Sequence, residues 1–288
     1  MTWYPFHASN WPKSIIHPED YDGGERLSIS FDLGAVPEKD KNKLILKWCA
    51  TLPELKHVRW LNLWSQVNQP LFDAACEMSN LESLQIKWSS IKSLEQIRRL
   101  QNLLFFSIGS STKIESIEPV AALQSLKLLD IENFKSVSDF SPLFQLSGLE
   151  SLSVTGSMWS RQKIGSLEPF ASMTWLRSLC IDTSHLDSLR AFANLTKLEN
   201  LGIGGRLPME EYAWLSAKLP NTACRWFDAY LDLSASGYSP CKRCKNPSMV
   251  MLTGRGARTL CRICESGKVE KHAAAFQMIK DRAATEQA

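Results

Sequence analysis

Apolar residues recur along the chain in a frame of the form L-x-x-L-x-L. The frame occurs seven times, and its final positions follow one another at intervals of 23, 22, 23, 23, 27 and 22. Alternation with a period of two predicts a short strand that presents its apolar side chains on one face. The alternating pairs are Leu61/Leu63, Leu84/Ile86, Phe106/Ile108, Leu129/Ile131, Leu152/Val154, Leu179/Ile181 and Leu201/Ile203.

A second apolar series, with a spacing of three, fills the intervals between the frames. Ile91, Leu94, Ile97 and Leu100 show it in one interval, and four other intervals repeat it. This period predicts a short 3₁₀ or irregular return segment. One strand and one return segment cannot bury their apolar faces alone, so the repeats are expected to stack. An insertion around 157–163 explains the single longer interval.

The ends of such a stack need caps, and the sequence offers candidates at both ends. Residues 24–50 predict a strand and then a helix from Pro37 to Ala50; after the repeats come a helix over Glu210–Leu219 and a last strand over Ala223–Leu231. The segment 1–23 is too aromatic for a solvated tail. The predicted domains are 1–50, 51–235 and 236–288. The residues that carry the N-terminal predictions are Trp3, Tyr4, Phe6, Trp11, Leu27, Ile29, Phe31, Leu33, Leu44, Ile45 and Trp48.

Three return segments carry a family resemblance. Glu118–Leu123, Ser141–Leu146 and Glu168–Met173 read EPVAAL, SPLFQL and EPFASM. With the frames, they make residues 50 to 230 similar to leucine-rich repeats of the short bacterial, internalin-like kind. The resemblance implies an α/β solenoid with a parallel sheet on its concave face, and a role in binding proteins. The asparagine usual at the turn is absent, which predicts some irregularity, because serine bonds the backbone more weakly. The replacements are Ser89, Ser111 and Ser184.

Side chains that alternate with the buried leucines point out of the concave face. Tryptophan and phenylalanine are common anchors of protein interfaces, and carboxylates suit a basic partner. For Trp60 and Trp64 two interpretations stay open, exposure to a partner or burial under the N-terminal segment. The predicted partner-binding residues are Trp60, Asn62, Trp64, Gln85, Lys87, Phe105, Asp130, Glu132 and Asp182.

Two C-x₂-C pairs, one at 241–244 and the other at 261–264, indicate a metal site. Each pair can aim two thiolates at one ion, so together they predict a closed, structural Zn²⁺ site. Residues 238–266 resemble a zinc ribbon, with a hairpin turn at 254–256, and Lys268–Ala284 predicts an amphipathic helix. The ribbon is expected to cap the solenoid or to provide a second contact; disulfides or another thiophilic metal are the alternatives. The predicted ligands are Cys241, Cys244, Cys261 and Cys264.

Composition and charge narrow the possible functions. With 44% hydrophobic and 22% charged residues, 14 Gly and 13 Pro, the 288-residue chain is neither collagen-like nor disordered. It contains no apolar run long enough to cross a membrane and no secretory pattern at its start, so we expect a cytoplasmic protein. Residues 241–288 hold 10 basic and 4 acidic residues, a balance of +6, which leaves −3 for the rest of the +3 chain.

That basic balance supports an alternative function, nucleic-acid binding. Arg255, Arg258 and Arg262 are the candidate contacts in the ribbon. However, four thiolates and one Zn²⁺ sum to −2, so part of the positive charge balances the site. Aromatic residues for base stacking are also missing from this module until Phe276.

Catalytic motifs are missing from the sequence. There is no phosphate-binding loop, zinc-protease helix, nucleophile elbow or dinucleotide fingerprint. Cys180, Asp182 and His185 form the one nucleophile set considered, and it would make the protein a repeat-guided transferase. We predict instead a non-enzymatic protein-recognition module, either an immunity protein that neutralises a toxin or an adaptor.

Overall fold

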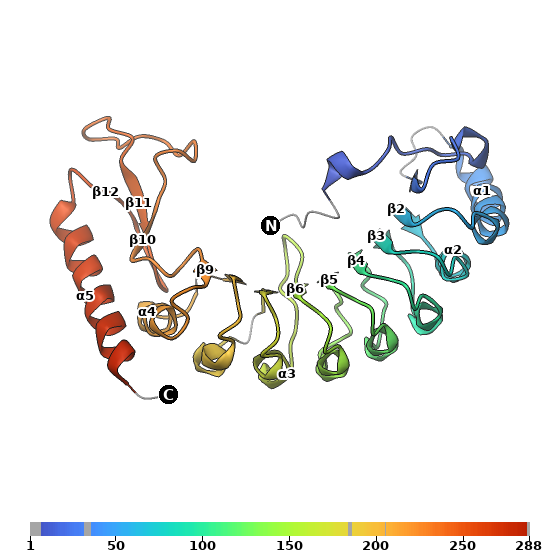
Figure 1. Ribbon diagram of the computed structural model, residues 1–288. Coiled ribbons are helices and arrows are strands. Elements are labelled where there is room, and N and C mark those ends of the chain that lie inside the picture. The colour runs from blue at the N-terminus through green and yellow to red at the C-terminus, as the bar shows by residue number, and fades with distance from the viewer. Residues whose placement is uncertain (1–6, 32–35, 184–185, 205, 287–288) are drawn as a thin grey trace. The chain divides into compact units, whose positions relative to one another are not determined.

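The computed structural model describes residues 7–31, 36–183, 186–204 and 206–286. The chain divides into two compact units, 1–169 with 182–184, and 170–181 with 185–288. Both units contain the predicted repeat of strand and return segment (Figure 1). Several residues named in the predictions lie outside the described ranges: Trp3, Tyr4, Phe6, Leu33, Ser184 and His185.

The first unit contains six parallel strands that pair in chain order. In the register, Leu61 lies opposite Leu84, which lies opposite Phe106. The frame positions therefore form continuous rows, and in this unit their side chains are at most 1% exposed. The strands are β1 (Arg26–Ser30), β2 (Trp60–Val67), β3 (Ser83–Ser89), β4 (Phe105–Gly109), β5 (Leu128–Glu132) and β6 (Ser151–Thr155).

The return segments are mostly 3₁₀ helices, as the spacing of three predicts. Their apolar residues, such as Ile97, Val120 and Leu143, are fully buried. Two of the described returns are α-helices, and the longer one is α2 (Gln69–Ala75), whose first turn is capped by the Asn68 side chain, which accepts from the Leu71 N–H at 3.1 Å. The others are η4 (Leu52–Glu54), η5 (Glu95–Arg99), η6 (Glu118–Ala122), η7 (Ser141–Gln145), the short α3 (Glu168–Ser172) and η8 (Arg190–Asn194).

The turns without asparagine are held by two other arrangements. Ser89 Oγ donates to Ser111 Oγ at 2.6 Å, so adjacent repeats share a serine pair. In the insertion, Gln162 is 2% exposed and turns its amide into the neighbouring repeat. Its Oε1 accepts from the Phe134 N–H at 2.9 Å, and its Nε2 donates to the carbonyls of Phe134 and Val137 at 2.8 Å each. The insertion therefore supplies an amide where the sequence lacks one.

The structure contains the strand and the helix that the sequence predicts before the repeats. Helix α1 (Glu38–Thr51) buries Leu44, Ile45 and Trp48, and β1 pairs with β2. The outer edge of β1 is covered by the N-terminal segment. The Ile15 N–H donates to Ser28 O at 2.9 Å, and the Ser30 N–H donates to Ile15 O at 3.0 Å. This pairing removes an open strand edge.

The second unit begins with strands β7 (Ser178–Ile181), β8 (Asn200–Ile203) and β9 (Ala223–Cys224), and helix α4 (Met209–Lys218) matches its prediction. The prediction of one strand over 223–231 is wrong. After β9 the chain turns, with the Phe227 N–H donating to Cys224 O at 3.1 Å. The next strand, β10 (Tyr230–Asp232), joins a different sheet.

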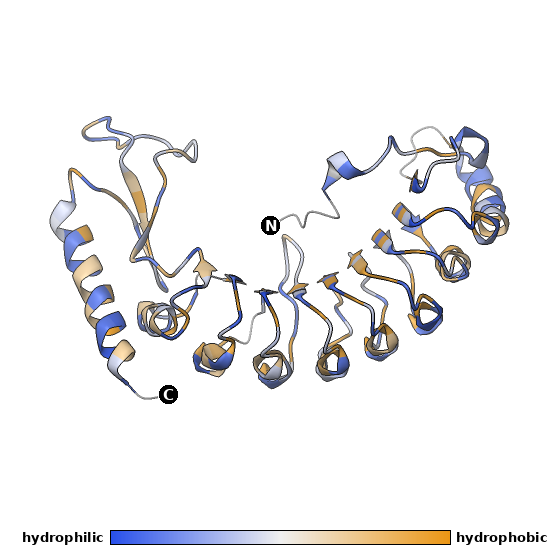
Figure 2. Cartoon of the chain, in the orientation of Figure 1, coloured by the Kyte–Doolittle hydropathy of each residue, from blue (hydrophilic) through white to orange (hydrophobic). Residues whose placement is uncertain are grey.

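That different sheet has three antiparallel strands. Strand β11 (Met249–Leu252) pairs with both β10 and β12 (Thr259–Cys261), which confirms the predicted hairpin. Val250, Leu260 and Val269 form its buried core. Val269 comes from α5 (Ser266–Thr285), a helix that packs against α4. Figure 2 shows hydrophobic and hydrophilic residues alternating along α5, as the amphipathic prediction requires.

Within the second unit, the hairpin turn lies directly against the start of α4. Arg255 donates its N–H to Leu207 O at 2.7 Å and its Nε–H to Arg206 O at 3.0 Å. Gly254 has φ +114°, and a Cβ there would lie 2.9 Å from the Met209 nitrogen. The small sheet therefore packs against the last repeat. None of the helices in the described part of the chain has the length and hydrophobicity that crossing a bilayer requires.

Candidate functional site

We use the term open face for the side of the first unit's sheet that lies opposite its return helices. Its side chains alternate with the buried leucines, so they stand in three rows across the strands. The rows bring together eight of the nine predicted partner-binding residues, all but Asp182. They are Arg26, Trp60, Ser83, Phe105, Leu128 and Ser151; Ser28, Asn62, Gln85, Ser107, Asp130 and Ser153; and Ser30, Trp64, Lys87, Gly109, Glu132 and Thr155.

The aromatic half of the open face centres on Trp60. Its ring centroid lies 6.0 Å from that of Phe105, and the Arg26 guanidinium lies 4.4 Å above it. Trp11, from the N-terminal segment, packs against it at 5.8 Å. Trp11 therefore covers part of Trp60, as one of the two interpretations expects. Ser83, between the strands of Trp60 and Phe105, is fully buried.

Three buried polar atoms in this half have no hydrogen-bond partner among the described residues. They are Trp11 Nε1, Asn62 Oδ1 and Ser83 Oγ. Asn62 is 7% exposed and uses only its Nδ2, which donates to Ser28 Oγ at 2.9 Å. A buried polar atom left without a partner costs about 1–3 kcal/mol of stability. These three atoms mark a part of the face whose hydrogen bonding among the described residues is incomplete.

Trp88 is an aromatic residue of this face that the sequence reasoning missed. Its ring makes an edge contact with Trp64 at a centroid distance of 5.0 Å. Trp88 has φ +57°, so the strict alternation of the strand fails there, and 46% of the residue is exposed. A pattern with a period of two gives no warning of such a residue. Arg26, by contrast, follows from extending the same alternation to Leu27 and Ile29.

The acidic half centres on Asp130. Ser107 Oγ donates to Asp130 Oδ2 at 2.9 Å. Burial raises the pKa of the Asp130 carboxyl above 3.8, although hydrogen bonds from Ser153 and Ser107 act in the opposite direction. The environment thus disfavours the charged form of a carboxylate that sits in the middle row.

An ion pair between Lys87 and Glu132 spans the third row. It passes over Gly109, where a Cβ would lie 3.0 Å from Lys87 Nζ and 3.3 Å from Glu132 Oε2. Ser110 Oγ also donates to Glu132 Oε1, at 3.4 Å. Glycine at this position therefore lets two charges on non-adjacent strands meet.

Asp182 follows β7, and its N–H donates to Val154 O of β6 at 3.2 Å. Its carboxylate pairs with Arg161 at 3.3 Å, and the Gln162 N–H donates to its carbonyl at 3.2 Å. In the nucleophile set, Cys180 lies in β7, close to the place where a Gly202 Cβ would be. The histidine of that set, His185, lies outside the described residues.

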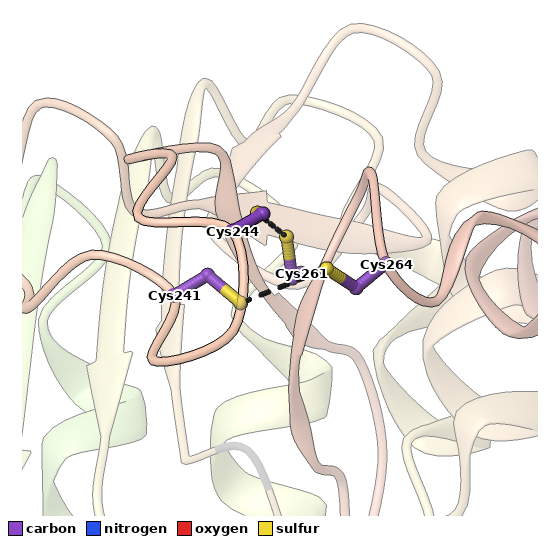
Figure 3. A group of neighbouring side chains, drawn as sticks. All are labelled: Cys241, Cys244, Cys261 and Cys264. Atoms are coloured by element: carbon purple, nitrogen blue, oxygen red, sulfur yellow. Dashed lines mark hydrogen bonds between the residues drawn. The ribbon is translucent and has the colours of Figure 1, made fainter.

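The four cysteines of the second candidate site converge (Figure 3). All four sulfur atoms lie within 4.8 Å of one another. The sulfur atoms of Cys241 and Cys264 are 3.9 Å apart, and those of Cys244 and Cys261 are 3.6 Å apart. Each C-x₂-C pair, Cys241 with Cys244 and Cys261 with Cys264, sits in a tight turn. The Lys245 N–H donates to Cys241 O at 2.8 Å, and the Glu265 N–H donates to Cys261 O at 3.0 Å. Such a group can hold a metal ion.

The surroundings of the sulfur atoms also suit a cation. Backbone N–H groups of Cys244 and Arg243 lower the pKa of Cys241 to about 6, which favours a thiolate. The Cys244 sulfur, and then burial, raise the pKa of Cys264 to about 12. Without a cation the crowded cluster keeps a proton on Cys264, and a positive ion would favour its release.

The structure gives the three ribbon arginines different surroundings. Arg255 binds the backbone carbonyl of Arg206, and Arg262 lies 3.9 Å from Asp232 and 5.4 Å from the Tyr230 ring. Arg258 is exposed. The three arginines therefore do not form a single free basic surface.

The sequence matches no family model and no curated protein. Among solved structures, the chain is similar to internalin C2 of Listeria monocytogenes, with 23% identity and a TM-score of 0.43 over 55% of this chain and 65% of that one. It is similar to internalin F of the same organism, with 24% identity and a TM-score of 0.42 over 59% and 55%. A leucine-rich-repeat protein of Leptospira interrogans gives 18% identity and a TM-score of 0.49 over 69% and 47%.

These matches span 47% to 65% of the neighbours' own lengths. The fold is identified on its own geometry. Parallel strands pair in register, with frame residues aligned from one repeat to the next, and a short helical return follows each strand. This recurring unit gives the chain the fold of leucine-rich-repeat proteins.

Proposed function

We propose that this protein is a non-catalytic recognition protein that binds another protein on its open face. The observation that carries the proposal is the grouping of Trp60, Phe105 and Trp64 with Asp130 and Glu132 on the one face of the sheet that return helices do not cover (Figure 1). Aromatic side chains on a rigid sheet supply contact area with little loss of side-chain entropy, which is why they anchor interfaces.

The two halves of the face define the chemistry of the partner. The aromatic half fits an apolar or aromatic anchor, and the acidic half fits a lysine or arginine beside it. A cation next to Asp130 would favour the carboxylate that burial disfavours. In our proposal the protein acts in the cytoplasm, either as an adaptor or as an immunity protein that neutralises a bacterial toxin.

Affinity capture from the native cell tests this function. The tagged wild-type chain is expected to retain a stoichiometric protein partner, and the Trp60→Ala/Phe105→Ala variant to retain at least tenfold less. Leu46→Ala is the matched control, because Leu46 is a 66% exposed apolar residue on α1. Equal capture by the wild type and the double variant would refute the open-face proposal.

We propose further that the four cysteines hold Zn²⁺ as a structural ion. In a tetrahedral thiolate site with Zn–S distances of about 2.3 Å, the sulfur atoms lie about 3.8 Å apart. Two of the sulfur–sulfur separations, 3.9 and 3.6 Å, fit this value, and all four sulfur atoms lie within 4.8 Å of one another. When bound, the ion cross-links the two turns of the ribbon. Four protein ligands leave no open position, so we assign no hydrolytic role to this site.

A second candidate function, nucleic-acid binding, is favoured by the exposed basic side chains of the ribbon, Lys242, Arg243, Lys245 and Arg258. Arg255 and Arg262 support nucleic-acid binding less, because each already contacts another residue of the chain. A salt-dependent gel shift with tRNA that disappears in Lys242→Ala/Arg243→Ala/Arg258→Ala would establish this function. The absence of a shift at low salt would exclude it.

A further inference from the structure

The chain's own N-terminal segment lies on part of the open face. From Ser14 onward it is fixed by backbone pairing to β1, by a 2.8 Å hydrogen bond between the hydroxyls of Ser14 and Ser28, and by a 2.8 Å bond from Trp48 Nε1 to Ile16 O. We call residues 7–13 the Trp11 segment. This segment meets the sheet through contacts that the side chains of Arg26 and Trp60 make with it.

These side-chain contacts hold the Trp11 segment in place. Arg26 Nη1 donates to Asn10 O at 2.7 Å, while the same guanidinium lies over the Trp60 ring. Trp11 also packs against the Trp60 ring. An arginine hydrogen bond and a ring contact join Asn10 and Trp11 to the sheet, whereas residues 14–16 are held by backbone and side-chain bonds to β1 and α1.

The fit of Trp11 is incomplete in a specific way. Trp11 Nε1 is a hydrogen-bond donor, and Asn62 Oδ1 is an acceptor; both are buried and neither has a partner among the described residues. Ser83 Oγ, in the strand next to that of Trp60, is also buried and without a hydrogen-bond partner among the described residues. A buried indole N–H normally finds a partner. The segment therefore places a ring against Trp60, but Asn62 Oδ1 and Ser83 Oγ remain without hydrogen-bond partners among the described residues.

We propose that Trp60, Phe105, Asn62 and Ser83 form a binding site for an extended peptide segment that carries a tryptophan or tyrosine, and that the Trp11 segment is a displaceable occupant of this site. The inference rests on the proposed recognition function and names its ligand class. The incoming ring packs against Trp60 and Phe105, and its N–H or O–H donates to Asn62 Oδ1. A ligand that completes this bond displaces one that does not.

The chemistry excludes purely aliphatic anchors as the preferred ligand. Leucine or isoleucine would fill the space next to Trp60 but would leave Asn62 Oδ1 and Ser83 Oγ without partners. Phenylalanine has the ring but no donor. Tryptophan and tyrosine combine both features at a low cost in side-chain entropy.

The test uses the full chain and a fluorescein-labelled peptide with the sequence of residues 7–14, HASNWPKS. Fluorescence anisotropy is measured with the wild type and with Trp11→Ala. We expect the peptide to bind Trp11→Ala and to bind the wild type at least tenfold more weakly, because a tethered segment competes at a millimolar effective concentration. The same peptide with leucine in place of tryptophan should bind at least tenfold more weakly than the original, because it loses the ring contact with Trp60.

Two double variants control the location of the site. Trp11→Ala/Phe105→Ala should lose peptide binding, and Trp11→Ala/Leu46→Ala should keep it. Circular dichroism verifies folding. Trp11→Leu serves as a second opened variant, because it removes the ring that packs against Trp60 but keeps an apolar side chain at this position. Absence of binding to both opened variants, equal binding by wild type and Trp11→Ala, or equal binding of the leucine peptide would each overturn the proposal.

The outcome is separable from that of the proposed function. Trp11→Ala should also capture at least threefold more of the cellular partner than the wild type does. If the peptide results hold while Trp60→Ala/Phe105→Ala captures the partner normally, the recognition function fails and the peptide site stands. If capture depends on Trp60 and Phe105 but the peptide does not bind, the peptide site fails alone.

Discussion

Asp130 illustrates, at the scale of single residues, how a buried carboxyl group can lower the stability of the folded state at neutral pH. Its pKa is raised above 3.8 chiefly by burial. The folded protein therefore binds this proton more tightly than the unfolded chain does. The stability linked to this group is fully present below pH 3.8 and is lost as the pH rises through the folded-state pKa. A residue that lowers stability at neutral pH is better explained by function than by folding.

We therefore expect Asp130→Asn to raise the free energy of unfolding at pH 7, on the order of 1 kcal/mol, because the charge is removed. The variant should also flatten the decline in stability above pH 4 and weaken partner capture. Urea unfolding between pH 3 and 8 measures both stability effects. Ser107→Ala, which removes a hydrogen bond that favours the charged form, should change stability in the opposite direction at pH 7. A less stable Asp130→Asn would contradict this account.

Gly254 fixes the contact between the hairpin and α4. Its φ of +114° disfavours any L side chain, and a Cβ would collide with the Met209 backbone. Gly254→Ala should destabilise the protein by about 1–3 kcal/mol. Gly256→Ala is the matched control, since Gly256 also has a positive φ, +71°, but open space around it; its loss should be about 1 kcal/mol. Thermal unfolding compares them, and equal losses would mean that the contact contributes nothing.

At the scale of elements, our proposal of a structural ion implies that the small sheet depends on an ion held by its four cysteines more than on its core. Val250, Leu260 and Val269 make up the buried cluster, which is little apolar surface for an independent module. We expect Cys244→Ser to abolish stoichiometric metal binding and to increase hydrogen exchange in β10, β11, β12 and the start of α5. Mass spectrometry after exchange, with metal analysis, provides the measurement.

Cys49→Ser is the control for that experiment, because Cys49 lies in α1, within the other unit. It should retain the metal and the wild-type exchange pattern. Retention of one metal ion per chain by Cys244→Ser, with unchanged exchange in the ribbon, would show that the four-cysteine site is not what holds these strands together.

The predictability of the elements follows from their periodicity. Strands β2 to β8 and the 3₁₀ returns can be predicted because their spacing of leucines repeats, and the four cysteines because C-x₂-C spacing is short-range. The prediction for β10 is wrong because only its pairing with β11, further along the chain, separates it from β9. The Gln162 amide could not be foreseen, since an insertion delivers it from outside the repeat frame.

The rows of the open face are predictable for the same reason, but departures from strict alternation and the cover on the face are not. Alternation places Trp60, Asn62 and Asp130 correctly on one face. Trp88 escapes prediction because a left-handed backbone conformation breaks the alternation. For the cover on Trp60 the sequence leaves two interpretations open, because no repeat pattern relates the N-terminal segment to the sheet. Local periodicity thus predicts the rows, whereas contacts between distant segments decide what covers them.

At the scale of the whole molecule, the central claim is that the open face meets another protein in the cell. Site-specific photo-crosslinking tests it most directly. A photoreactive phenylalanine analogue placed at Gln85, in the middle row between Asn62 and Ser107, would lie within reach of a bound partner. The same analogue at Gln124, an exposed glutamine that follows the return helix η6, is the matched control.

Irradiation of the native cells should convert the Gln85 derivative into a discrete adduct with one other polypeptide. The Gln124 derivative should give no such band. Adding Trp60→Ala/Phe105→Ala should abolish the Gln85 adduct. No adduct at Gln85, or the same adduct at both positions, would contradict recognition through the open face.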